Sequence, residues 1–134
     1  MLKSLEQERA RYAWKCIMEI KKEKNGELEK KYKSYVKKAP TLIQNSGLGN
    51  TLAFYKSKSS ESSQKKGERQ EAYEKIYNHL KRWFQIRSGK KEDILHWIIS
   101  EKTSSIEVFK TTKEIILLLN WMKKFVESEL KGEE

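Results

Sequence analysis

One proline and two glycines that closely follow it limit how this chain can fold between residues 38 and 58. Pro40 is the only proline in 134 residues, and Gly47 and Gly49 lie within the next ten positions. A proline fits the first turn of a helix, where its missing N–H would have no partner. Gly47 can take the left-handed conformation that ends a helix. The pattern predicts two short apolar helices meeting at a glycine corner, although an ordinary helix–helix turn is the simpler explanation of these residues.

Apolar residues recur at intervals of three and four on both sides of this corner, which is typical of amphipathic helices. Apart from the helices at the corner, we expect helices over residues 2–24, 27–38, 68–87, 93–100 and 105–130. The residue before a proline avoids the helical conformation, so the second of these helices should end or kink at Ala39. No segment alternates with a period of two. The sequence therefore predicts an all-α fold, a compact single domain of about five to six helices over residues 1–134.

Two further expectations concern the division between core and surface. Residues 57–67 are rich in serine and lysine and contain no apolar residue, so burial cannot offset the entropy lost on ordering them. We expect a mobile loop there, too short to separate two domains. The inward-facing stripe of the last helix should comprise Ile106, Phe109, Ile115, Ile116, Leu119, Met122 and Val126.

The chain carries a strong excess of positive charge, with 29 Lys and Arg against 19 Asp and Glu and a formal net charge of +10. Such an excess attracts polyanions, nucleic acid first and an anionic membrane surface second. The basic residues occur as pairs along the whole chain. That distribution fits a solvated charged surface, or a surface that follows a sugar–phosphate backbone without reading bases.

Several features favour a cytoplasmic protein. The single cysteine, Cys16, cannot form an internal disulfide. Charged residues at positions 6–11 stand where a signal peptide would be apolar, and the longest apolar run, residues 115–119, is too short to span a bilayer. Binding to a membrane surface needs an exposed apolar face beside the lysines, and we expect the core to use all the apolar stripes.

Side chains suited to catalysis are few and badly spaced. His79 and His96 are the only histidines, and no Cys/His spacing fits zinc. We expect His79 on a helix surface and His96 partly buried. Because neighbours on a helix point in different directions, His79 cannot converge with Lys81 and Arg82 on one phosphate.

The acidic pair Glu92-Asp93 resembles a metal site, but at a helix start it is better explained by the positive end of the helix dipole. We therefore expect no catalytic residue, no metal and no cofactor. Most aromatic residues lie within apolar stripes and should be core. Trp14 is the exception, because it lies off the inward face beside Lys15, and we expect it to anchor another protein chain.

Several segments of the chain resemble, in order and spacing, the small subunit of the type III-B CRISPR (Cmr) RNA-silencing complex. The first is the corner, with Pro-Thr-Leu-Ile at 40–43, Gly-Leu-Gly at 47–49 and Thr-Leu-Ala-Phe at 51–54. The second is the last helix, over residues 109–114 and 117–125, where Met122 and Val126 are mild departures from the family pattern. Residues 11–14 and 73–83 are more loosely similar.

The resemblance implies an all-helical, non-catalytic subunit whose copies stack into a short filament beside the backbone subunits that hold the CRISPR RNA. Its expected partners are the backbone and large subunits of the complex, neighbouring small subunits, and the guide and target RNA. No membrane and no small-molecule substrate are expected. Guide pairing would read the target sequence, while this subunit would hold the guide–target duplex by its backbone.

We expect the RNA-binding residues to be cations that follow or face away from an apolar stripe on a rigid helix: Lys15, Lys22, Arg82, Arg87, Lys123 and Lys124. The alternative is a basic helical protein that acts alone on DNA or on a membrane surface. Co-purification with a guide-RNA complex would distinguish the two.

Overall fold

Six α-helices make up the part of the chain that the computed structural model describes, residues 4–60 and 67–132. They are α1 (Leu5–Lys22), α2 (Gly26–Ser46), α3 (Leu48–Ser59), α4 (Glu68–Ser88), α5 (Ile94–Ile99) and α6 (Ser105–Glu129). None of the described residues lies in a β-strand. The predicted all-α fold is confirmed.

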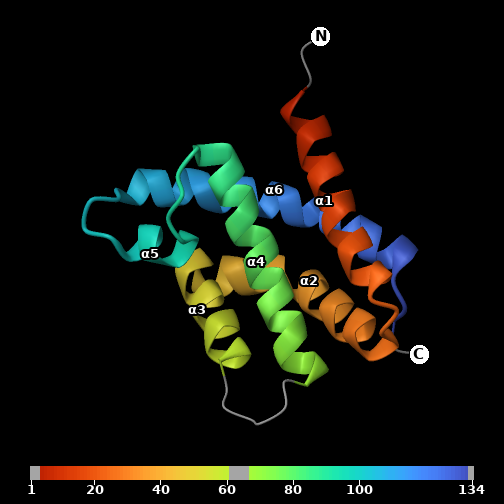
Figure 1. Ribbon diagram of the computed structural model, residues 1–134. Helices are drawn as coiled ribbons and strands as arrows, with labels where there is room; N and C mark the ends of the chain where they lie inside the picture. The colour runs from red at the N-terminus through yellow and green to blue at the C-terminus, as the bar shows by residue number, and fades with distance from the viewer. Residues whose placement is uncertain (1–3, 61–66, 133–134) are drawn as a thin grey trace.

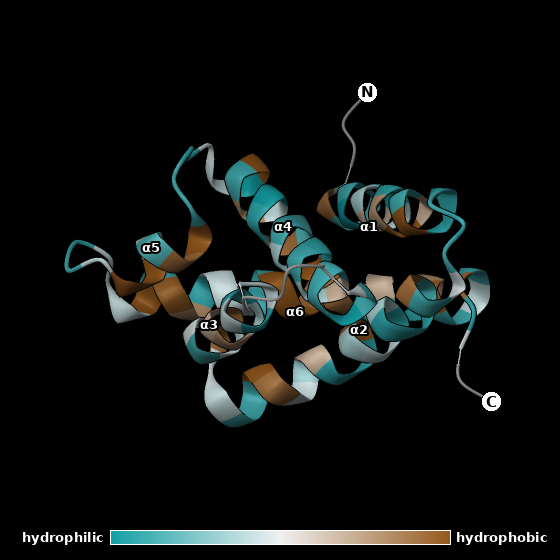
Figure 2. Ribbon diagram, turned by 60° about the horizontal axis from the view of Figure 1, so that its bottom comes forward, coloured by the Kyte–Doolittle hydropathy of each residue, from teal (hydrophilic) through white to brown (hydrophobic). Residues whose placement is uncertain are grey.

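The helices pack around α4, which crosses the molecule in Figure 1. α4 rests on α2 and α3, while α1 packs mainly on α6, and α2 also contacts α6. α5 and the start of α6 form one end of the molecule, and α1 lies toward the other (Figure 1). Figure 2 shows that the visible side of α4 is mostly hydrophilic.

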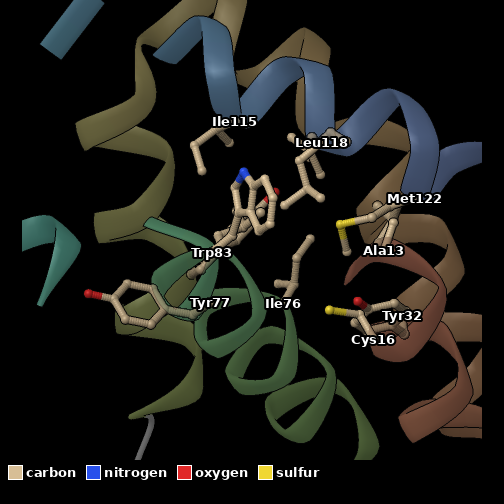
Figure 3. Close-up of a cluster of buried hydrophobic side chains, with 14 of the residues drawn as sticks. Ala13, Cys16, Tyr32, Ile76, Tyr77, Trp83, Ile115, Leu118 and Met122 are labelled. Carbon is tan, nitrogen blue, oxygen red and sulfur yellow. The ribbon is translucent and has the colours of Figure 1, made fainter. Parts of the chain in front are cut away.

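All six helices contribute buried apolar side chains to one core. Figure 3 shows its centre, where Ile76 and Trp83 of α4 point toward Ile115 and Leu118 of α6. Each of these four side chains is almost fully buried. A continuous core of this kind fixes the rotation of each helix and therefore which of its residues face solvent.

The sequence predicted that the helix should end or kink at Ala39, and it does not end there, because α2 continues through Pro40 to Ser46. The proline nitrogen cannot donate a hydrogen bond to the carbonyl group one turn earlier, so one intrahelical bond is missing. Val36, Ala39 and Ile43, on both sides of the proline, are buried in the core. Their burial holds the two parts of α2 in one helix. The short helix expected to begin at Pro40 is therefore the last part of α2.

The glycine corner is confirmed, and it joins α2 directly to α3. Gly47 has φ +86° and ψ +158°, and its N–H donates to the Ile43 carbonyl at 2.8 Å. Its own carbonyl accepts hydrogen bonds from the backbone and the hydroxyl group of Thr51. A Cβ atom on Gly49 would lie 3.2 Å from Cγ2 of Ile98, so the missing side chain lets α5 approach α3 closely.

The first three residues of the loop expected over 57–67 lie in a helix instead, because α3 continues to Ser59. The hydroxyl groups of Ser57 and Ser59 each bond to a carbonyl group one turn earlier, Phe54 and Lys56 respectively. Residues 61–66 lie outside the described part of the chain. α4 begins directly after Gly67.

The backbone of Gly47 leads to a stability prediction. Its φ and ψ fall in a region that essentially only glycine occupies. We expect Gly47→Ala to lower the free energy of unfolding by about 1–3 kcal/mol, measured by urea denaturation. Gly67→Ala is the matched control, because Gly67 has φ −77° and no neighbour within 4 Å of an added Cβ. Equal losses in the two variants would contradict this interpretation.

Candidate nucleic-acid interface

His79 is fully buried, so its predicted position on a helix surface is wrong. Its ring joins three helices. Nδ1 lies 2.6 Å from the hydroxyl oxygen of Tyr32 on α2, and Nε2 lies 2.8 Å from a carboxylate oxygen of Glu19 on α1. The Tyr12 hydroxyl also donates to the His79 backbone carbonyl. These bonds make His79 a structural link rather than a surface group.

The hydrogen bonds around His79 determine which nitrogen of its imidazole ring carries the proton. Burial raises the pKa of Glu19, but hydrogen bonds from Arg82 and His79 outweigh burial and lower this pKa to about 2. The ionised carboxylate only accepts hydrogen bonds, so Nε2 of His79 must donate and Nδ1 must accept from Tyr32. Burial lowers the pKa of His79 to about 4, although Glu19 acts in the opposite direction. The ring is therefore neutral at physiological pH.

The other groups considered for chemistry also have structural explanations. His96 is exposed rather than partly buried as predicted. Asp93 caps α5 by accepting from the backbone N–H of His96, and the Tyr77 hydroxyl lies 2.7 and 2.8 Å from its two carboxylate oxygens. Cys16 is buried, and burial raises its pKa to about 12. Within residues 4–60 and 67–132, no cluster of three or more His, Cys, Asp or Glu side chains could hold a metal ion.

Four of the six cations expected to bind RNA are exposed lysines on two helices that pack side by side. Lys15 and Lys22 lie on α1, and Lys123 and Lys124 lie on α6. The ammonium group of Lys124 sits 5.4 Å from the ring centre of Trp121. This contact holds the charged end of Lys124 near the groove between the two helices, which Arg9, Leu117 and Lys124 help to line.

The two predicted arginines are also at the surface, but each faces a carboxylate of α1. Arg82 donates two hydrogen bonds to Glu19, at 3.0 and 3.3 Å. Arg87 lies 3.7 Å from Glu8. The Glu19–Arg82 pair is part of the link between α1 and α4. The charge on Arg82 is therefore largely balanced within the protein, and Arg82 is a weaker candidate for RNA than the four lysines.

The structure also gathers lysines that the sequence showed only as dispersed pairs. Lys30, Lys33, Lys37 and Lys38 of α2 line a hollow of about 380 Å³. One feature of the sequence indicated this cluster. Lysines 30, 33 and 37 are three and four residues apart, and residues at that spacing share one side of a helix. That spacing could not show that Gly132, which follows α6, lies in the wall of the hollow.

Trp14, the expected anchor for another protein chain, is 42% exposed and packs edge-on against Phe125 of α6. A second exposed apolar group lies at the opposite end of the molecule. Ile99, Ile106 and Phe109 are 69%, 65% and 59% exposed. The prediction that Ile106 and Phe109 face the core is wrong, because the start of α6 extends beyond the helices that cover the rest of it (Figure 1).

The sequence led us to expect no binding to a membrane surface, on the assumption that the core uses every apolar stripe. The exposed apolar side chains at the start of α6 contradict that assumption. Spanning a membrane is a separate matter. Over the described ranges, each helix is either too short or too polar to cross a bilayer.

A comparison with protein-family models finds one family for nearly the whole chain. The model of CRISPR-associated protein (Cas_Cmr5) matches residues 5–129. The match begins at the first residue of α1 and ends at the last residue of α6. It therefore covers the complete helical fold, including the corner at Gly47.

The buried imidazole makes stability depend on pH. As the pH falls below about 6.5, the unfolded chain binds a proton at His79 that the folded chain excludes until about pH 4. Folding free energy is therefore lost across this window, by about 2 kcal/mol between pH 7 and pH 5. His79→Gln should lack this component of the loss. Urea denaturation of both proteins at the two pH values measures it, and equal losses would contradict the assignment.

Proposed function

The chain belongs to the Cas_Cmr5 family of CRISPR-associated proteins and is thus a subunit of a CRISPR Cmr complex, and we propose that it is the non-catalytic small subunit that holds the target RNA. Membership of the family implies association with other subunits of that complex. The contact with RNA, the place in a filament and the absence of catalysis are our proposals.

The main support for the proposed contact with RNA is the set of exposed lysines on two helices, α1 and α6, that pack against each other. Lys15 and Lys22 are two turns apart on α1, and α1 packs on α6, which presents Lys123 and Lys124. Side chains on rigid helices lose less entropy on binding than side chains on a loop. Lysines attract phosphates by charge and do not distinguish bases, so pairing with the guide would supply the sequence specificity.

A holding role also agrees with the chemistry of the described side chains. The buried histidine is neutral and fully hydrogen bonded, Asp93 caps a helix, and Cys16 is buried with a raised pKa. Each group is therefore engaged in the fold. We propose that RNA cleavage in the assembled complex belongs to another subunit.

Exposed apolar side chains at both ends of the molecule support a place between neighbouring subunits. Trp14 lies on α1, which is toward one end of the molecule, and Ile106 and Phe109 lie in the start of α6, which is at the other end (Figure 1). Aromatic side chains that a partner buries dominate the energy of many interfaces. Contacts at two ends also suit a subunit that repeats along a filament, where many weak RNA contacts act together.

The RNA contact is tested by reversing two charges. We expect Lys123→Glu with Lys124→Glu to weaken target-RNA binding by the assembled complex by roughly tenfold at moderate salt, because two phosphate contacts become repulsive. The subunit should keep its urea midpoint. The matched control is Lys90→Glu with Lys91→Glu, an adjacent exposed pair beyond α4. Unchanged affinity, or equal loss in the control, would count against the α6 lysines.

The protein contact is tested at Trp14. Replacement by alanine should reduce incorporation of the chain into the complex, because truncating a buried interface tryptophan typically costs about 2 kcal/mol or more. Ile86→Ala serves as the control, since Ile86 is 61% exposed on α4. Incorporation is read by co-purification with a tagged partner subunit. Full incorporation of the Trp14 variant would exclude Trp14 from the interface.

A further inference from the structure

The lysine hollow between α2 and the end of the chain is separate from the lysines assigned above. Its lining includes Lys30, Lys33, Lys37 and Lys38 of α2, Glu127 of α6, and Gly132. The lining therefore holds four lysines and one carboxylate, and Glu27 lies 3.6 Å from the Lys30 nitrogen. Such a concave, positively charged surface favours an anionic ligand over a neutral or cationic one.

Lys33 forms a fixed part of this surface. Its side chain is only 12% exposed, and its ammonium group donates to the backbone carbonyl of Leu130 at 3.2 Å. A Cβ atom on Gly132 would lie 3.1 Å from the Lys33 nitrogen, so the missing side chain makes room for the ammonium group. The segment that follows α6 is held by a second bond, from the N–H of Lys131 to Glu29 at 3.1 Å. A cation positioned in this way needs little further ordering to bind an anion.

An anion already occupies this position from within the protein. The carboxylate of Glu127 lies 3.2 Å from the Lys37 nitrogen and 3.9 Å from the Lys33 nitrogen. The hydrogen bond from Lys37 and the charges of Lys33 and Lys37 lower the pKa of Glu127. Its side chain is 61% exposed, so it can turn toward solvent without disturbing the core. The carboxylate marks where a stronger anion would bind.

We propose that this hollow binds a backbone phosphate of an RNA strand, which displaces Glu127 from Lys33 and Lys37. The phosphate oxygens would accept hydrogen bonds from these ammonium groups, and the hydroxyl group of Ser34, in the same lining, can donate a further one. Lys38 and Lys30, which also lies near Glu27, add positive charge to the lining. The inference rests on the proposed contact with RNA, and it adds a second site distinct from the lysines of α1 and α6.

The test is an NMR titration of the full chain, labelled with ¹⁵N, by a single-stranded uridine octanucleotide at low salt. This method detects binding even at millimolar dissociation constants. We expect the amide signals of residues 30–38 and 127–132 to shift and to saturate. Uridine, which carries no phosphate, should leave these signals unchanged.

Two variants should change the affinity in opposite directions. Glu127→Gln removes the internal competitor and should tighten binding roughly threefold, while Lys30→Gln with Lys37→Gln should weaken it roughly fivefold. Lys30 and Lys37 are 37% and 50% exposed, so their replacement should leave the fold intact. The control is Lys102→Gln with Lys110→Gln, which removes the same charge at the α5–α6 end and should have little effect.

Several results would overturn the inference. Either of two results would exclude a phosphate that competes with the Glu127 carboxylate. The first is that the amide signals around the hollow do not shift, and the second is that Glu127→Gln binds no more tightly than the wild type. Pyrophosphate or polyglutamate shifting these signals where the octanucleotide does not would assign the hollow to a free phosphate or an acidic protein. Shifts confined to the region of Lys123 and Lys124 would overturn this inference while supporting the proposed function.

Discussion

The position of α1 depends on hydrogen bonds between helices that converge on two carboxylates. Glu19 accepts from the buried His79 and from Arg82 of α4. Glu114 of α6 accepts two hydrogen bonds from Arg9 of α1, at 2.6 and 2.8 Å, and a third from the indole of Trp83 at 3.1 Å. Hydrogen bonds that involve charge and are partly shielded from water are directional as well as strong. They fix the rotation of α1 and therefore the direction in which Lys15, Lys22 and Trp14 point.

This arrangement uses acidic side chains between helices and leaves most lysines on the outer surface. Glu19 and Glu114 bind arginines between helices, and Glu29 accepts from the backbone of Lys131. Arg is suited to such pairs because its planar group matches a carboxylate, whereas Lys is a flexible, well-hydrated charge. The excess of +10 is therefore carried largely by surface lysines. A surface of this kind suits a polymer of phosphates that is bound along its length rather than read base by base.

Helical periodicity was sufficient to predict the all-α fold and the corner at Gly47, because both follow from local backbone preferences. It failed where contacts with a part of the chain far away in sequence determine the local structure or the burial of a side chain. Pro40 remains inside a helix because residues on both sides of it are buried, which the local rule cannot include. His79 could have been placed correctly, since it lies three residues after Ile76 and four before Trp83, on the buried stripe. The exposure of Phe109 depends on where the start of α6 lies relative to the other helices, and the lysine hollow depends on where the segment after α6 lies relative to α2. The spacing of residues within one segment does not contain that information.

The pairing of the first helix with the last has a consequence for how the protein is made. Arg9 and Glu114 are separated by 105 positions, yet they form one of the shortest ion pairs between helices. On the ribosome, α1 emerges first and has no access to its main packing partner until α6 has left the exit tunnel. The complete bundle therefore cannot form until α6 has emerged, and loading into a larger particle must come later still.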